Sequence, residues 1–442
     1  MSALARYFLA EGKQVAGYDR TASPVTQSLS GEGAEIHFSE SVGRIRETYP
    51  CREKLLVIYT PAIPADHSEL VYFRENGFTV YKRAEILGMI TREMKCIAVA
   101  GTHGKTTVSA MITHLFATAG MPFSALLGGI SRNYGTNAVL HANSEWMITE
   151  ADEFDRSFLH LTPATAVITS CDADHLDIYG NEAALKEAFV QFINRIPRGG
   201  NLVVKYGLEL DLPAGGDMRV MTYSVNDDRA DFYARDIRLE ERFYHYSVSV
   251  PGGNIFELKN GYPGLVNVEN AVAAAVVGYL HDLDEGSIRI ALETFSGVQR
   301  RFDIRTETEN LVYIDDYAHH PREIEAFIRS VREMYPQRSI TGVFQPHLYS
   351  RTRDLADGFA TSLSELDELI LLDIYPAREE PVEGITSELI FEKVRSGQKS
   401  RCRKEDLMDL LKERNPEVLL TMGAGDIDQL VEPIRLWIKT RR

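Results

Sequence analysis

The sequence has few cysteines, no long apolar run and a shortage of positive charge. Its four cysteines, Cys51, Cys96, Cys171 and Cys402, form no Cys-x-x-Cys pair and lack metal-site spacing. Reduced thiols in a cytoplasmic protein are therefore expected. No apolar run approaches the about 18 residues of a membrane span, and charged residues interrupt the first segment, so we expect neither a membrane anchor nor a signal peptide. The formal net charge of -16 argues against broad binding of nucleic acid or of an anionic membrane.

The length of 442 residues corresponds to two to four domains at about 150 residues each. We expect three parts, residues 1–92, 93–297 and 298–442. In the first part, residues 1–11 read as a helix ending at Gly12, and residues 14–18 as a short strand. The apolar run at residues 54–59 is typical of a buried parallel strand. Alternating helices and strands at this spacing predict a doubly wound α/β unit.

The start of the chain is unusual for such a unit. An α/β nucleotide-binding unit normally opens with a strand and a glycine-rich turn, whereas here the helix comes first. Two interpretations follow: a natural protein with a longer N-terminus, which we favour, or a truncated form with a damaged first domain. Either predicts weak binding of a diphosphate ligand by the first part.

The other two parts also read as α/β. In the second part, residues 96–100 predict a strand, 108–119 a helix, 220–258 antiparallel strands, and 268–280 an alanine-rich helix that packs closely. In the third part, helical segments separate four strand candidates, at residues 311–314, 339–344, 368–372 and 417–422. This alternation predicts a second Rossmann-like domain.

A glycine-containing segment between a predicted strand and a predicted helix carries the strongest functional signal. Residues 101–107 read Gly-Thr-His-Gly-Lys-Thr-Thr, and we call them the phosphate loop. Backbone N–H groups in such a turn, together with the helix N-terminus, bind phosphate oxygens. Lys105 would reach the β- and γ-phosphates and the Thr106 hydroxyl a Mg²⁺ ion. The fit to the full P-loop pattern is incomplete, because Val99 stands where that pattern has a glycine.

Acidic residues follow two further predicted strands, at residues 145–149 and 166–170. Carboxylates at the C-terminal edge of parallel strands lie where α/β sheets bind ligands. Glu150 follows the first strand directly, and His175 lies in the acidic segment after the second. Because ATP chemistry needs divalent cations, we interpret Glu150 and His175 as metal ligands rather than solvated loop residues.

Together these segments resemble the Mur ligase family. The match takes in the phosphate loop, the acidic segment at residues 150–158, the histidine segment at 174–177 and Asn-Val-Glu-Asn-Ala at 267–271. In the third part it continues, in order, through Arg-Arg-Phe at 300–302, Asp-Asp-Tyr-Ala-His-His-Pro at 315–321, and the segments at 345–351, 373–379 and 423–426. The resemblance spans nearly the whole chain.

The resemblance implies Rossmann-like N- and C-terminal domains flanking a P-loop ATPase-like central domain. It implies ATP and Mg²⁺ as cofactors, and UDP-N-acetylmuramate and L-alanine as substrates in peptidoglycan precursor synthesis. The carboxylate of the sugar would form an acyl phosphate that the alanine amine then attacks. A monomer or weak dimer is expected.

The implied site residues fall into four groups. ATP would contact Gly101, Thr102, His103, Gly104, Lys105, Thr106, Thr107, Asn270 and Arg301. Metal ligands would be Thr106, Glu150 and His175. Catalytic roles fall to Lys105, Asp316, Tyr317 and His319, of which the last three orient the acceptor and accept its proton. The substrates would contact Asp19, Thr60, Arg351 and Arg378.

Three alternatives remain open at this point. The related ligase that attaches a recycled tripeptide to the same nucleotide sugar shares the phosphate loop. Folylpolyglutamate synthase shares the architecture but lacks the segment at residues 315–321. A non-catalytic nucleotide sensor would not need the motifs of the third part. An ADP-release assay with each amino acceptor separates them.

Overall fold

The computed structural model describes residues 1–440 apart from 62, 175, 213–216, 254 and 378. The chain divides into two compact units. Unit 1 comprises Met1–Arg235, Ser247–Leu258 and Asn270–Thr294, and unit 2 comprises Asp236–Tyr246, Lys259–Glu269 and Phe295–Arg442. Within the described residues, no helix is long and apolar enough to cross a membrane.

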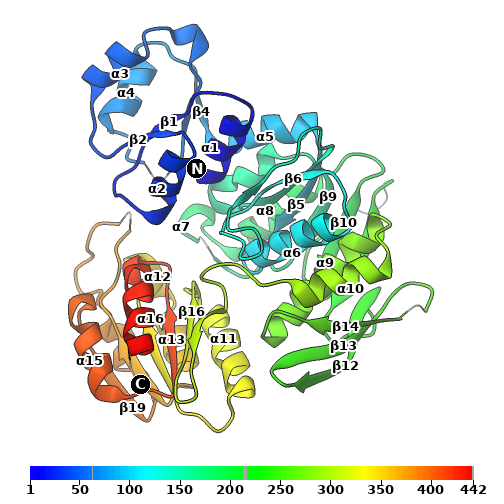
Figure 1. Cartoon of the computed structure of the whole chain (residues 1–442), viewed down its shortest axis with the longest axis vertical. Helices are drawn as coiled ribbons and strands as arrows, with labels where there is room; N and C mark the ends of the chain where they lie inside the picture. Colours follow the sequence, from blue (N-terminus) through cyan, green and yellow to red (C-terminus); the bar gives the residue numbers. More distant parts are fainter. Residues whose placement is uncertain (62, 175, 213–216, 254, 378, 441–442) are drawn as a thin grey trace. The chain divides into compact units, whose positions relative to one another are not determined.

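The first part of unit 1 alternates helices and short strands (Figure 1). Strands β1 and β2 form one parallel pair, and β3 and β4 form another. The elements are α1 (Ser2–Ala10), β1 (Ala16–Tyr18), α2 (Pro24–Gly31), β2 (Glu35–His37), α3 (Val42–Thr48), η1 (Arg52–Lys54), β3 (Val57–Tyr59), α4 (Ser68–Glu75), β4 (Val80–Lys82) and α5 (Arg83–Glu93).

The apolar run at residues 54–59 is shorter and less buried than its composition predicts. Only Val57–Tyr59 pairs as a strand, all three of its residues are half-buried, and the Leu56 side chain is 43% exposed. A parallel strand is present, because β3 pairs in parallel with β4, but the expectation that it is buried was wrong. The two strands form a sheet of their own, which covers little of the run.

A ten-stranded sheet follows, in the order β14-β13-β12-β11-β10-β9-β5-β8-β6-β7. Its elements are β5 (Lys95–Ala100), α6 (Lys105–Thr118), β6 (Phe123–Leu126), β7 (Ala138–Val139), β8 (Trp146–Ala151), η2 (Phe154–His160), β9 (Pro163–Ile168), α7 (Leu176–Tyr179), α8 (Glu182–Ile193), β10 (Asn201–Lys205), β11 (Arg219–Ser224), β12 (Phe232–Glu240), β13 (Phe243–Ser249), β14 (Ile255–Asn260), α9 (Leu265–Leu280) and α10 (Glu285–Thr294).

Strand β5 is the centre of the parallel part of this sheet. It pairs in parallel with β8 on one side and β9 on the other, and residues 96–100 are fully buried. Such an all-apolar run is typical of a strand covered on both faces. Strand β11 pairs in parallel with β10 and β12, so the expectation of antiparallel strands throughout residues 220–258 was wrong for its first strand.

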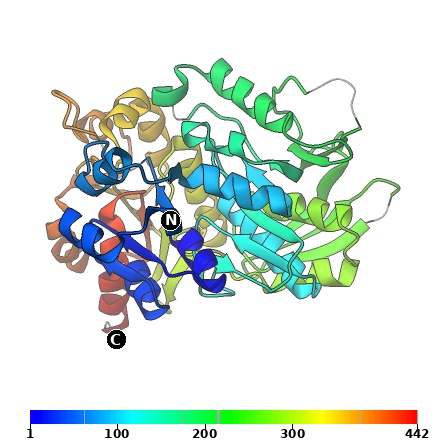
Figure 2. The same cartoon turned by 90° about the horizontal axis from the view of Figure 1, so that it is seen from above.

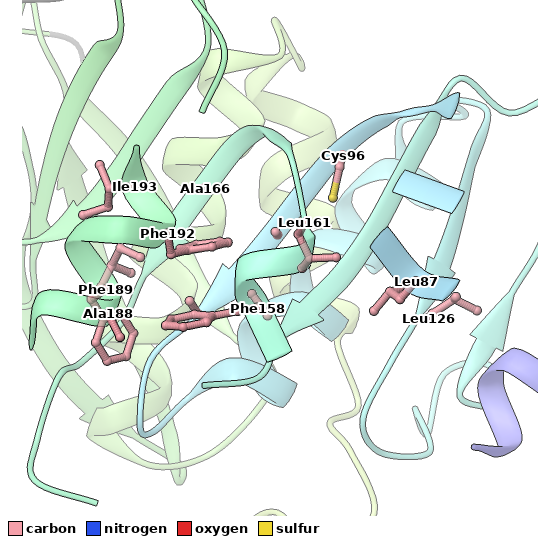
Figure 3. Close-up of a cluster of buried hydrophobic side chains, with 14 of the residues drawn as sticks. Leu87, Cys96, Leu126, Phe158, Leu161, Ala166, Ala188, Phe189, Phe192 and Ile193 are labelled. Carbon is pink, nitrogen blue, oxygen red and sulfur yellow. The ribbon is translucent and has the colours of Figure 1, made fainter. Parts of the chain in front are cut away.

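Aromatic residues fill the core beside β5 and β9 (Figure 3). The Phe158 ring stacks on Phe192 with centroids 5.0 Å apart and meets the Phe189 ring edge-on at 5.4 Å. These rings join the short helix η2 to α8. Helix α1 lies beside the cyan strands of the sheet (Figure 2), where Arg6 Nη1 donates to Asn137 Oδ1 at 2.6 Å.

Unit 2 contains a six-stranded sheet in the order β15-β16-β20-β17-β18-β19, parallel except for the β15–β16 pair. Its elements are β15 (Asp303–Glu307), β16 (Val312–Asp316), α11 (Pro321–Met334), β17 (Ile340–Phe344), α12 (Tyr349–Asp354), α13 (Ala356–Leu363), β18 (Glu368–Leu371), α14 (Glu388–Phe391), β19 (Gln398–Arg401), η3 (Lys404–Asp406), α15 (Leu407–Arg414), β20 (Val418–Met422), η4 (Asp426–Leu430) and α16 (Val431–Thr440). The four strands expected in this part are present as β16, β17, β18 and β20.

Candidate functional site

The phosphate loop connects the end of β5 to the start of α6, and its two glycines are required by its shape. Gly101 has a φ of +138°, and a Cβ there would lie 2.1 Å from Thr169 Oγ1. Gly104 has a φ of +82° and is the N-cap of α6. Both conformations favour glycine, and the close packing of Gly101 leaves no room for a side chain.

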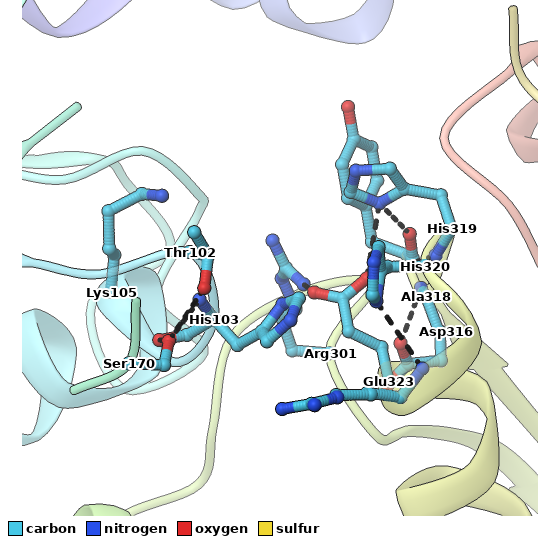
Figure 4. A network of polar contacts seen from close by, with 12 residues as sticks. Thr102, His103, Lys105, Ser170, Arg301, Asp316, Ala318, His319, His320 and Glu323 are labelled. Atoms are coloured by element: carbon cyan, nitrogen blue, oxygen red, sulfur yellow. Dashed lines mark hydrogen bonds and ion pairs between the residues drawn. The ribbon is translucent and has the colours of Figure 1, made fainter. Parts of the chain in front are cut away.

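Polar contacts attach this loop to the residues that follow β9 (Figure 4). The hydroxyls of Thr102 and Ser170 are 3.0 Å apart, and the His103 N–H donates to Ser170 Oγ at 2.8 Å. The Asp172 N–H donates to Thr102 Oγ1 at 3.1 Å, and His103 Nε2 lies 3.4 Å from the Asp172 carboxylate. The loop is thus held in shape by residues that follow β9.

Lys105 opens α6 and lies in a buried ion pair. Its Nζ donates to the two carboxylate oxygens of Glu153 at 2.9 and 2.8 Å and to the Gly101 carbonyl at 2.6 Å. The side chain of Lys105 is 16% exposed and that of Glu153 is 1% exposed. Burial acts to lower the pKa of Lys105, but the carboxylates of Glu153, Asp152 and Glu150 outweigh it and raise that pKa, so the ammonium stays charged.

Glu150 lies within β8, in register with Val99 at the end of β5. Its Oε1 accepts the Gly128 N–H at 2.7 Å, and a Cβ on Gly128 would come within 2.5 Å of the carboxylate. The carboxylate of Glu150 and the hydroxyl of Thr106, the second residue of α6, are hard oxygen donors of the kind Mg²⁺ prefers. The third predicted ligand, His175, lies outside the described residues, among which no group of three or more His, Cys, Asp or Glu could hold a metal.

Two further predicted nucleotide contacts belong to unit 1. Asn270, on α9, is buried, and its Oδ1 lies 3.0 Å from the point where a Cβ on Gly104 would stand. It therefore borders the phosphate loop. Thr107 is buried in the first turn of α6.

In unit 2, Asp316 ends β16 and fixes the backbone around it (Figure 4). Its two carboxylate oxygens accept the N–H groups of Phe302 and Ala318, each at 2.6 Å. Burial raises the pKa of Asp316 to about 7, although Arg301 acts in the opposite direction. The carboxylate ties the turn at Arg301 to the segment that carries the next predicted residues.

Tyr317 and His319 lie just after Asp316 in the sequence. The guanidinium carbons of Arg300 and Arg301 lie 5.1 and 4.9 Å from the centre of the Tyr317 ring. His319 Nδ1 is 3.0 Å from the Tyr317 carbonyl oxygen and 3.3 Å from the Glu323 carboxylate. The structure thus brings Arg301, Asp316, Tyr317 and His319 together.

His320, next to His319, caps helix α11. It is the N-cap residue, and its Nδ1 accepts the Arg322 N–H at 3.3 Å.

Sequence reasoning missed three residues of these sites. Glu153 holds Lys105, Glu323 contacts both His319 and Arg301, and the buried Asp315 pairs with Arg300 Nε at 3.3 Å. Glu153 and Asp315 stand inside acidic motifs, so the signal was present. Which carboxylate faces inward depends on packing that composition does not reveal.

The residues predicted to contact the substrates lie on different elements of the chain. Asp19 is exposed and follows β1, whereas Thr60 is half-buried and follows β3, which belongs to a different strand pair. Arg351, on α12 of unit 2, is 9% exposed. Arg378 lies outside the described residues.

Comparison with known proteins agrees with these motifs. The family described as Mur ligase family, catalytic domain, matches residues 1–95, the Mur ligase middle domain residues 99–278, and the Mur ligase, glutamate ligase domain residues 300–425. A UDP-N-acetylmuramate–L-alanine ligase from Porphyromonas gingivalis is 48% identical over 441 residues, covering 100% of this chain and 97% of that protein.

Two solved structures share the architecture. The UDP-N-acetylmuramate-alanine ligase of Thermotoga maritima superposes with a TM-score of 0.84 at 26% identity, covering 100% of this chain and 97% of its own. A murein peptide ligase from Psychrobacter arcticus gives a TM-score of 0.74 at 21% identity, with the same coverage, and shows a shared fold. The expected family and three-domain fold are confirmed: this chain belongs to the Mur ligase family.

Proposed function

We propose that this chain uses ATP to join L-alanine to the lactyl carboxylate of UDP-N-acetylmuramate, in peptidoglycan precursor synthesis. The observation that carries the proposal is 48% identity, over essentially the whole length, to a protein named for this reaction. The phosphate loop, with its two positive-φ glycines and its charged lysine, supports the use of ATP.

The chemistry needs ATP because a carboxylate is a poor acylating agent near neutral pH. A lactyl carboxylate oxygen attacks the γ-phosphorus, the bond to ADP breaks, and an acyl phosphate forms. The alanine amine then attacks the acyl carbon, phosphate leaves, and the amine loses a proton. The Lys105 ammonium and the loop N–H groups stabilise charge on the phosphates.

Mg²⁺ is part of the proposal. The oxygen donors Thr106 and Glu150 fit it, with His175 as the third proposed ligand, and the ion would neutralise charge on the phosphates. In unit 2, His319 is proposed to accept the amine proton. Asp316 positions it by fixing the backbone of Ala318, and Arg351 and Arg378 are proposed to hold anionic groups of the substrates. Asp19 and Thr60 are proposed contacts of the UDP-sugar.

The product mass tests this proposal. The chain is incubated with UDP-N-acetylmuramate, ATP, Mg²⁺, a mixture of amino acids and the tripeptide L-alanyl-γ-D-glutamyl-meso-diaminopimelate. We expect the added mass of one alanine, with smaller amounts of glycine and serine products, because a small apolar pocket discriminates by only about 1–3 kcal/mol per methylene. Faster addition of the tripeptide would instead assign the chain to the recycling ligases, and no ligation of any acceptor would favour a nucleotide sensor.

A further inference from the structure

The contacts of Lys105 leave its ammonium group fully engaged. A lysine ammonium has three N–H donors, and here it meets three acceptors: the two Glu153 oxygens at 2.9 and 2.8 Å and the Gly101 carbonyl at 2.6 Å. A phosphate oxygen can therefore bind Lys105 only if one of these acceptors gives way. The Gly101 carbonyl belongs to the loop itself, which leaves Glu153 as the partner to be exchanged.

Glu153 is held in place by the segment around it. Its backbone carbonyl accepts the Tyr179 hydroxyl at 2.6 Å and the Arg156 N–H at 3.0 Å. The next turn contains two consecutive non-glycine residues at positive φ, Asp155 at 52° and Arg156 at 54°. Backbone of this kind persists where surrounding contacts impose it, and it clusters at functional sites. The segment thus presents the Glu153 carboxylate to the phosphate loop at a fixed position.

Charge and burial decide what the pair does. An ATP phosphate and the Glu153 carboxylate are both anions, and both would contact one buried ammonium. A buried lysine without a counter-charge is costly, so the pair stabilises the loop. The same pair opposes nucleotide binding, because the carboxylate must be separated from Lys105 first.

We propose that Glu153 is a positioning residue that holds Lys105 and competes with the nucleotide phosphates for its ammonium group. This inference rests on the proposed use of ATP. It assigns Glu153 a part in setting the affinity for ATP, through its contact with Lys105.

The test compares two substitutions in the same segment of the full-length chain. Glu153→Gln removes the competing charge, and Asp155→Asn is the matched control, since Asp155 pairs with Lys82 at 2.8 Å at a partly exposed site. Calorimetry with the non-hydrolysable analogue adenylyl imidodiphosphate and Mg²⁺ measures Kd. We expect Glu153→Gln to bind the analogue about fivefold or more tightly than the parent chain. Asp155→Asn should stay within about twofold of it. Unchanged or weaker binding by folded Glu153→Gln overturns the proposal.

Two further variants separate a positioning role from a structural one. In a Lys105→Met background, Glu153→Gln should tighten binding much less than in the parent chain, because no ammonium is left to be released, and equal tightening there overturns the proposal. Glu153→Asp keeps the charge but draws it back by one methylene, so we expect a smaller gain in affinity than with glutamine. If Glu153→Gln does not fold, an aspartate variant with the parent affinity overturns the proposal.

Kinetics supply a readout that general damage would not mimic. In Glu153→Gln the KM for ATP should fall while the KM for L-alanine stays unchanged, and a parallel rise in both contradicts the inference. Failure of the parent chain to bind the analogue at all would instead count against the proposed function.

Discussion

At the scale of single residues, the buried Lys105–Glu153 pair predicts that one substitution affects both catalysis and stability. Lys105→Ala should lower the rate of ADP production by about three orders of magnitude, because it removes a charge aimed at the transferring phosphoryl group. It also takes the ammonium from a carboxylate that is 1% exposed, which should lower the free energy of unfolding by about 3 kcal/mol. A coupled ADP assay and urea denaturation measure the two effects. Normal turnover by the folded variant would refute the assignment of Lys105.

Asp316 predicts a pH dependence of stability. Its pKa is raised to about 7, mainly by burial, against about 3.9 in an unfolded chain. The folded state therefore binds the proton more tightly. The stability that protonated Asp316 contributes to the folded state is fully present below about pH 4, and it is lost as the pH rises toward 7. In Asp316→Asn, the slope of unfolding free energy against pH should differ from that of the parent chain by about 1.4 kcal/mol per pH unit across this window. Parallel curves would show that Asp316 titrates normally.

Local and distant contacts differ in how far the sequence predicts them. The phosphate loop was predictable because strand, glycines, lysine and helix are consecutive. The contacts of Lys105 with Glu153 and of Phe302 with Asp316 join residues 48 and 14 positions apart. They depend on which strands become neighbours, and neither spacing nor residue type specifies that.

At the scale of elements, helix α6 offers a comparison between its two ends. Gly104→Ala places a Cβ 3.0 Å from Asn270 Oδ1 in a backbone with positive φ, so it should weaken binding of adenylyl imidodiphosphate at least about tenfold by distorting the loop. Gly120→Ala, just beyond the other end, also has a positive φ but meets nothing within 4 Å. It should cost about 1 kcal/mol of stability and leave nucleotide affinity unchanged. Equal losses of affinity in both variants would show that the effect is general destabilisation.

In the six-stranded sheet, composition explains the two strands that escaped prediction. In β19, which reads Gln-Lys-Ser-Arg, none of the residues is apolar, and β15 alternates charged and polar residues around one isoleucine. Both are edge strands of the six-stranded sheet, held by backbone pairing with one neighbour. A hydrophobic pattern marks a strand only where a face is buried, so the central strands β16, β17, β18 and β20 were predictable and the edges were not.

At the scale of the whole molecule, the division into two compact units predicts which unit a bound nucleotide stabilises. The phosphate loop, Glu150 and Asn270 all belong to unit 1, so binding of adenylyl imidodiphosphate should stabilise that unit. If the buried amides of β5 and β9 exchange only through unfolding of unit 1, they should exchange about a hundredfold more slowly at a ligand concentration of 100 times Kd.

Amides of β17 and β20 in unit 2 provide the internal control for this measurement. If the two units unfold independently, their exchange should change by less than about threefold, because the binding free energy is not available to them. Hydrogen exchange with peptide resolution distinguishes the two sets within one sample. Equal protection of β5 and β20 would mean that the two units unfold as one. Protection confined to β20 would place the nucleotide in unit 2, against the assignment of the phosphate loop.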